Sequence, residues 1–192
     1  MCRALLLLII SACAVEPAPS PPPPDHGLIG TWRYVPVRAD VAIDQRQVLV
    51  FGADGRYSMT DPRSAEAGTF EIEGDDVTIS SSARGWIRTN YAVTPDRLIV
   101  DALLPTGETD GLVGTWSGAQ STEQETSVLE LELRADGTGH LVQTGSASDD
   151  VNATWIEDEP YTVITFEGRT RPRSLPTLVG VAIGEWLYER IE

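Results

Sequence analysis

The sequence predicts an all-β protein built from two tandem repeats, and three observations support this. Apolar and polar residues alternate over short runs, as they do in antiparallel strands that bury one face. Asp and Gly separate these runs at close intervals, and both residues form tight turns at little cost. Three short motifs then recur in the same order further along the 192-residue chain. Beyond the N-terminal segment, no window of about 11 residues shows a helical period with caps.

The recurring motifs divide the chain near residue 110. Three pairs of motifs match: Leu-Ile-Gly-Thr-Trp at 28–32 with Leu-Val-Gly-Thr-Trp at 112–116, Ala-Asp-Gly at 53–55 with 135–137, and Thr-Phe at 69–70 with Thr-Trp at 154–155. The offsets are 84, 82 and 85 residues. Because the order is kept and the offsets are nearly equal, we interpret the motifs as an internal duplication, with repeats at 28–110 and 111–192.

In the first repeat, alternation and turn residues locate the strands. The run 48–51 is β-branched and aromatic, and the Ala-Asp-Gly turn follows it directly. Later strands are expected where residues on one face recur at every second position: Tyr57 and Met59; Phe70 and Ile72; Val77 and Ile79; Ile87, Thr89, Tyr91 and Val93. A further strand at 98–100 closes the repeat after the turn at Pro95-Asp96.

In the second repeat, the run 129–133 alternates Leu with Glu, so its leucines share one face. If the turn that follows pairs Leu133 with Gly139, Glu132 lies beside His140 on the outer face. Such a pair is typical of a surface ladder, where it has a small effect on stability.

The C-terminal segment 178–184 alternates Val and Ile with Gly and Ala. Its small face predicts close approach to another backbone or to the other repeat. With these runs included, the sequence predicts about twelve to fourteen strands.

The N-terminus predicts export and a lipid anchor. Arg3 precedes a seven-residue apolar run at 4–10, which suits a signal peptide and is too short to span a bilayer. The residues Ile-Ser-Ala-Cys at 10–13 resemble a bacterial lipobox, in which the cysteine becomes lipid-modified. We therefore predict a signal peptide at 1–12 and a lipid on Cys13 that holds the protein at a membrane of the cell envelope. The alternatives are cleavage at the Ala-Cys-Ala sequence with plain secretion, and a misassigned start.

A proline-rich segment follows at 13–27, with four consecutive prolines at 21–24. Such sequences favour the extended polyproline II conformation and act as semi-rigid spacers. We expect this segment to be a tether between the membrane and the folded part.

Composition excludes several chemistries. The chain has a net charge of −15, and all 14 of its basic residues are Arg. The absence of Lys excludes Schiff-base catalysis, and the acidity argues against nucleic acid as a partner. Cys2 and Cys13 are the only cysteines, so the part after the signal peptide is expected to hold no disulfide, catalytic thiol or thiolate metal site. No dinucleotide or phosphate-binding motif occurs, and no cofactor is expected.

At this point the motifs resemble those of bacterial lipocalin-like domains. The matching residues are Gly30, Trp32, 53–57 and 68–70 in the first repeat, and Gly114, Trp116, 135–137, Trp155 and 186–188 in the second. The resemblance implies two tandem small antiparallel lipocalin-like β-barrels, which would leave no open sheet edge. The alternative is two half-barrels that share one core, because each repeat is shorter than a full lipocalin barrel.

Two sets of residues are candidates for binding. Trp32, Trp116 and Trp155 are expected either to line a ligand site or to fill a barrel floor. The stretch with Arg169, Arg171 and Arg173 is the one basic cluster and is a candidate anion contact. No catalytic or metal-binding residue is nominated.

These observations favour a non-enzymatic envelope lipoprotein that binds a small apolar ligand or a protein partner. The alternative is a carboxylate-based enzyme that acts in the mouth of a barrel.

Overall fold

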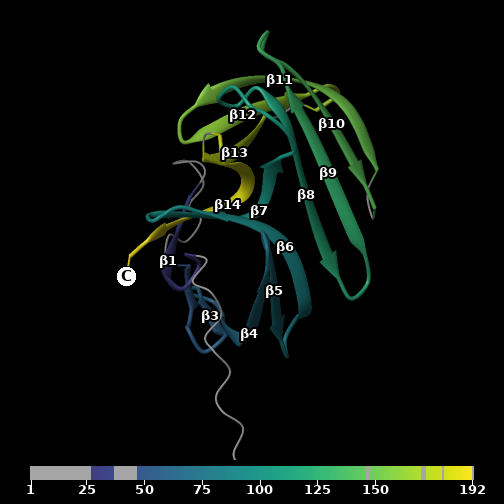
Figure 1. The fold of residues 1–192 in the computed structure, drawn as a ribbon. Helices are drawn as coiled ribbons and strands as arrows, with labels where there is room; N and C mark the ends of the chain where they lie inside the picture. The colour runs from purple at the N-terminus through teal and green to yellow at the C-terminus, as the bar shows by residue number, and fades with distance from the viewer. Residues whose placement is uncertain (1–26, 37–46, 146–147, 170–171, 179, 192) are drawn as a thin grey trace, which may run out of the picture.

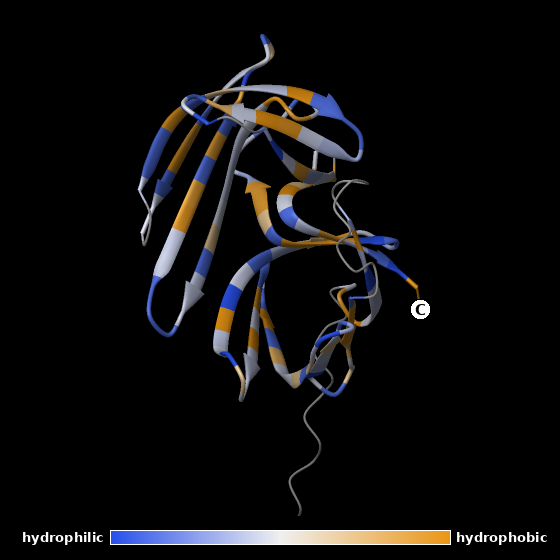
Figure 2. Cartoon of the chain, turned by 180° about the vertical axis from the view of Figure 1, so that it is seen from behind, coloured by the Kyte–Doolittle hydropathy of each residue, from blue (hydrophilic) through white to orange (hydrophobic). Residues whose placement is uncertain are grey.

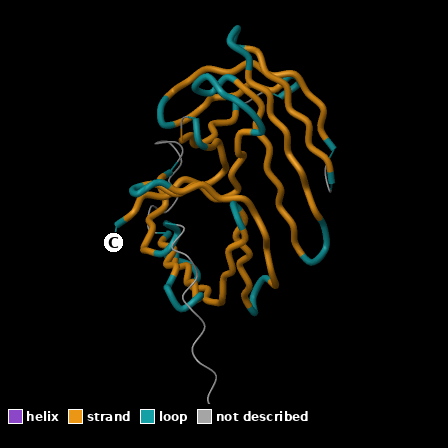
Figure 3. Tube along the Cα trace, viewed as in Figure 1, coloured by secondary structure: helices purple, strands orange, loops and turns teal. Residues whose placement is uncertain are grey.

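A computed structural model describes residues 27–36, 47–145, 148–169, 172–178 and 180–191. The described chain is all-β, with strands joined by turns and loops and no helix (Figure 3). The strands are β1 (Gly30–Val35), β2 (Val48–Phe51), β3 (Arg56–Thr60), β4 (Ala65–Glu73), β5 (Asp76–Ser81), β6 (Gly85–Val93), β7 (Arg97–Pro105), β8 (Gly114–Thr122), β9 (Thr126–Leu133), β10 (Thr138–Thr144), β11 (Asp149–Asp158), β12 (Tyr161–Phe166), β13 (Arg173–Leu178) and β14 (Ala182–Arg190). The predicted all-β class and strand number are confirmed.

All fourteen strands pair antiparallel in a single sheet that closes on itself. Every strand pairs with the next one along the chain, and β14 returns to pair with β1. Apolar and polar residues alternate along most strands, as Figure 2 shows. This alternation is the reason that the strands could be located from the sequence.

A further pairing joins β7 to β14 and divides the sheet into two closed rings of strands. The first strand ring contains β1 to β7 together with β14, and the second strand ring contains β8 to β14 together with β7. In Figure 1, β1 to β6 lie at one end of the molecule, β8 to β13 lie at the other, and β7 and β14 run between them. Each ring is therefore closed by the last strand of the other half of the chain.

The two faces of the β7–β14 pair bury different hydrophobic clusters. Leu98 and Tyr188 face the cluster inside the first strand ring. Leu103 and Ile183 face the cluster inside the second. A third hydrophobic cluster contains further residues of the pair, among them Ile99 of β7. Because side chains alternate between the faces of a strand, one strand pair can serve both clusters.

The sequence predicted that small residues in 178–184 allow a close approach between backbones. The structure shows this approach at one position, Gly184 of β14, which lies against β7. A Cβ on Gly184 would lie 2.1 Å from Ile99 Cγ2 and 3.0 Å from the Asp101 carbonyl oxygen. Only Gly allows this approach between the halves. Gly180 does not take part, because it lies in the turn before β14 with nothing within 4 Å of its Cβ position.

The two Ala-Asp-Gly motifs form the same turn. Gly55 and Gly137 adopt φ angles of 76° and 79°. Gly55 donates its N–H to the carbonyl of Gly52 at 3.1 Å, and Gly137 donates to Arg134 at the same distance. The turn after β9 also sets the predicted register, with Leu133 opposite Gly139 and Glu132 opposite His140. His140 contacts Asp150 of the next strand through Nε2, at 2.8 Å.

The shared pair makes the two halves depend on each other, and this can be tested with fragments. A fragment of residues 27–110 contains β1 to β7 but lacks β14, so β1 and β7 would each lose a neighbour. We expect this fragment to show no cooperative thermal transition in circular dichroism by itself. Addition of the fragment 111–192 should restore a cooperative transition. A cooperative β-sheet melt of 27–110 alone would contradict the dependence on β14.

Candidate functional site

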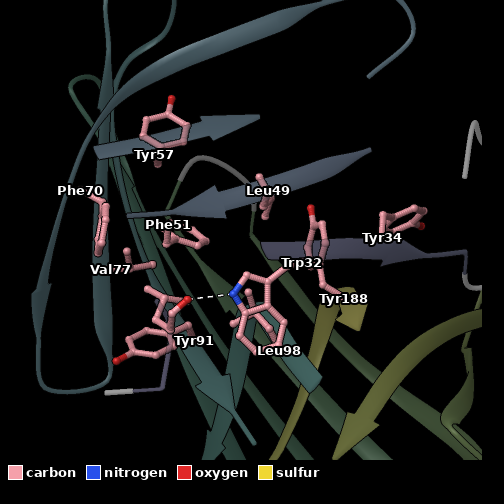
Figure 4. Packing of buried hydrophobic residues seen from close by; sticks show 11 residues of the cluster. Trp32, Tyr34, Leu49, Phe51, Tyr57, Phe70, Val77, Tyr91, Leu98 and Tyr188 are labelled. Atoms are coloured by element: carbon pink, nitrogen blue, oxygen red, sulfur yellow. Dashed lines mark hydrogen bonds between the residues drawn. The ribbon is translucent and has the colours of Figure 1, made fainter. Parts of the chain in front are cut away.

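The second strand ring holds a partly open cavity of about 180 Å³, which a residue of β6 also lines. Its walls are formed by residues of β6 to β10 and β12 to β14. The first strand ring is filled differently, because aromatic side chains occupy its interior (Figure 4). There the centroid of the Phe51 ring lies 5.0 Å from the centroid of the Phe70 ring and 6.5 Å from that of the Tyr57 ring. Burial, with a hydrogen bond to Glu66, raises the pKa of Tyr57 to about 12.

One part of the cavity wall is apolar. Leu131, Leu141, Phe166 and Leu175 are buried and belong to the hydrophobic cluster of the second ring. Leu129 is partly buried against the same cluster. These side chains give the cavity a surface that favours contact with an apolar group over contact with water.

The other part of the wall is polar. Thr89, Gln120, Ser127 and Gln143 contribute hydroxyl and amide groups, and Asp101 contributes a carboxylate. Ser127 accepts a hydrogen bond from Gln143 Nε2 at 3.2 Å. A surface that is apolar on one part and hydrogen-bonding on another suits an amphipathic small molecule.

Two further charges, Arg173 and Glu185, complete the wall. Arg173 Nη2 donates a hydrogen bond to Glu185 Oε1, so β13 and β14 are joined by an ion pair. Their side chains are 42% and 36% exposed, which identifies the pair as the solvent-facing edge of the cavity.

Asp101 is the unusual residue of the site. Its φ of 56° makes it the one non-glycine residue with positive φ in the described part of the chain, a conformation that costs free energy for such residues. Its Oδ1 accepts hydrogen bonds from Thr89 Oγ1 at 2.6 Å and Gln120 Nε2 at 3.2 Å, and its Oδ2 accepts one from Trp186 Nε1 at 3.2 Å. Burial raises the pKa of the Asp101 carboxyl above its ordinary value, against the opposing effect of the hydrogen bond from Thr89.

The position of Asp101 explains its conformation. β6 pairs with β7 at 91–93, but with β8 at 87–89. β7 in turn pairs with β8 only from Leu104 onward. Asp101 lies where these pairings change over, so regular strand geometry is interrupted there. Nearby, a side chain replaces a backbone acceptor, since Asn90 Oδ1 accepts the N–H of Ala119 at 2.7 Å.

Asp101 was not among the residues nominated from the sequence. The one available signal was a single acidic residue inside the apolar run of 98–104. An acidic residue in such a run suggests a partly buried carboxylate, which is uncommon, but the sequence alone does not place it beside β6, β8 and β14.

Two of the three tryptophans that were candidates for a ligand site or a barrel floor lie in the hydrophobic cores and do not line the cavity. Trp32 and Trp116 are fully buried. Trp32 Nε1 donates to the Leu28 carbonyl at 2.8 Å (Figure 4), and Trp116 Nε1 donates to the Leu112 carbonyl at 3.0 Å. The Trp32 ring also packs under the Arg190 guanidinium, 4.3 Å from the ring centroid.

Trp155 has a different environment. It is partly buried against the core of the second ring. Its Nε1 donates to the carbonyls of Arg134 and Thr138, at 3.1 and 3.0 Å. Trp155 therefore holds the turn between β9 and β10.

The basic cluster is divided among several environments. Arg173 lines the cavity as part of its ion pair with Glu185. Arg169 pairs with Asp149 and lies 5.3 Å from the centroid of the Phe166 ring. Arg171 lies outside the described residues, as does Cys13.

Comparisons with known proteins assign no family. No protein-family model matches the chain, and neither a curated protein nor a solved structure does. The lipocalin-like resemblance therefore stays a prediction. Within the described residues, no group of His, Cys, Asp and Glu side chains is placed to hold a metal ion. The same residues include no helix long and apolar enough to cross a membrane.

The raised pKa of Asp101 predicts a specific pH dependence of stability. A carboxyl whose pKa is higher in the folded state favours folding most below its unfolded pKa, about 3.9, and loses that contribution as pH rises through the folded value. The free energy of unfolding of the wild type, relative to Asp101→Asn, should therefore decrease as pH rises above about 3.9, the unfolded pKa. Urea unfolding of both proteins measures the difference, with Glu130→Gln on the exposed face of β9 as control. A constant difference would contradict the raised pKa.

Proposed function

We propose that this chain is a non-enzymatic envelope lipoprotein that binds a small apolar ligand in the cavity of the second strand ring. The observation that carries the proposal is the cavity itself, with buried leucines and Phe166 on one part of the wall and polar groups, including the Asp101 carboxylate, on another. A small ligand accounts for these apolar side chains better than a protein partner does, because they line a concave space and not a protruding surface.

The proposal includes the finer architecture. Each strand ring is a small lipocalin-like barrel, and the two barrels share β7 and β14. The matching turns at Gly55 and Gly137 and the matching tryptophan hydrogen bonds of Trp32 and Trp116 support an internal duplication. One of the two barrels then keeps an open interior for the ligand, while aromatic residues fill the other.

Catalysis by carboxylates is the alternative, and one observation favours it. Asp101 and Glu185 both line the cavity, and burial raises the pKa of Asp101, as in many general acids. However, Glu185 is engaged by Arg173, and Asp101 accepts three hydrogen bonds. Both carboxylates are therefore already held by the protein, and ligand binding remains the better-supported function.

The cavity predicts which ligands bind and which substitution blocks them. An apolar cavity of about 150 Å³ accommodates benzene, so the full chain should bind benzyl alcohol in a saturable manner by calorimetry. Leu129→Trp should weaken that binding at least about tenfold, because the larger ring occupies the cavity.

Ile156→Trp is the matched control, because Ile156 lies on β11 with 65% of its surface exposed and away from the cavity. This variant should bind benzyl alcohol as the wild type does. Equal loss in both variants, or no saturable binding to the wild type, would refute the cavity as the ligand site.

The lipid anchor is tested separately from the ligand. A lipid chain contributes about 0.8 kcal/mol of membrane affinity per buried CH₂. Cys13→Ala should therefore move the protein from the membrane to the soluble fraction, or block its processing. Fractionation and the intact mass measure both effects. A variant with the fractionation and mass of the wild type would rule out modification at Cys13.

A further inference from the structure

The cavity has an uneven charge balance. Asp101, Arg173 and Glu185 are its only ionisable wall residues among those that the structure describes. Arg173 and Glu185 form an ion pair with each other. One negative charge, that of Asp101, is therefore left over.

Asp101 has no cationic partner in the described chain. The ion pairs formed by the described arginines and by His140 do not include it. Its three hydrogen-bond donors, from Thr89, Gln120 and Trp186, are neutral groups. Asp101 is only partly exposed to water, and a carboxylate with reduced access to water gains more from a cation than from neutral donors.

The neighbours of this carboxylate limit the ligand that can reach it. The cavity brings Asp101 together with the buried side chains of Leu131 and Phe166. A ligand that contacts both parts needs a positive group attached to a compact apolar body. The volume of about 180 Å³ accommodates a body about as large as one aromatic ring.

We propose that the cavity binds a small primary amine with one ring or a short apolar chain, with its ammonium group beside Asp101 and its apolar body against Leu131 and Phe166. This inference depends on the proposed function, because it specifies the ligand of the same cavity. The net charge of −15 adds a long-range field that attracts cations.

An anionic ligand fits the same wall less well. Its acidic group would have to displace Glu185 from Arg173 and remain close to Asp101. Repulsion between like charges in a partly desolvated site opposes this arrangement. In this proposal Arg173 acts as the partner of Glu185, and its role as an anion contact stays a prediction.

Three probes of nearly equal size test the charge preference on the full chain. Benzylamine is a cation at neutral pH, benzyl alcohol is neutral and benzoate is an anion. We expect benzylamine to bind at least about tenfold more tightly than benzyl alcohol by calorimetry at pH 7, because hydrogen bonds between charged groups are stronger than neutral ones. Benzoate should bind most weakly.

The role of Asp101 is tested by substitution and by pH. Asp101→Asn should bring benzylamine to the affinity of benzyl alcohol, which removes the preference for the amine. In the wild type, benzylamine binding should weaken as pH falls through the raised pKa of Asp101, while benzyl alcohol binding stays constant. Any pH dependence that remains in Asp101→Asn would come from the other two ionisable wall residues, Arg173 and Glu185. The wild-type ranking and pH dependence need no variant, so they test the inference even if Asp101→Asn fails to fold.

The outcomes separate this inference from the proposed function. If benzyl alcohol binds as tightly as benzylamine, or if Asp101→Asn keeps the preference for the amine, the amine proposal is wrong and the apolar cavity stands. If none of the three probes binds, the proposed function fails as well.

Discussion

The pairing of β7 with β14 is the interaction on which the rest of the structure depends. Without it the fourteen strands would form one large ring, whose interior the side chains of a chain of this size would have to fill. With it, each ring contains eight strands, and each face of the shared pair supports a different core. Gly184 is part of this constraint, because a side chain there would collide with Ile99. The two halves thus share a strand pair and are not separate domains joined by a linker.

The two rings differ in residue size at matching positions. At the offset of the repeated motifs, Tyr34 and Tyr57 in the first half correspond to Gly118 and Gly139 in the second. Both tyrosines are buried in the first core, and Gly118 lines the cavity of the second. A Cβ on Gly118 would lie 2.4 Å from the Ala102 carbonyl oxygen, so this glycine lets β7 and β8 approach closely beside the cavity. The same architecture thus has aromatic side chains in the interior of one half and a cavity in the other.

Local features of this fold were predictable from the sequence, whereas the long-range ones were not. The turns at 53–55 and 135–137 and the pairing of Glu132 with His140 follow from residue types a few positions apart. The β7–β14 pairing joins segments about eighty residues apart, and alternation within a strand carries no information about its neighbour. Asp101 was missed for this reason. Its environment is created by strands from both halves, and Leu131 and Phe166 could be assigned to a core but not to a cavity wall.

The site and the junction between the halves are the same place. Asp101 and Glu185 fall between the paired positions Ala102–Gly184 and Val100–Trp186 on the shared strands. The changeover of strand pairing at this point imposes the positive φ of Asp101 and directs its carboxylate towards Thr89 and Gln120 of the neighbouring strands. A cationic ligand beside this carboxylate would supply the partner that Asp101 lacks among the described residues, at the contact between the two halves. Binding to the folded state alone would then stabilise both halves together by mass action, since neither ring closes without the strands that carry the site.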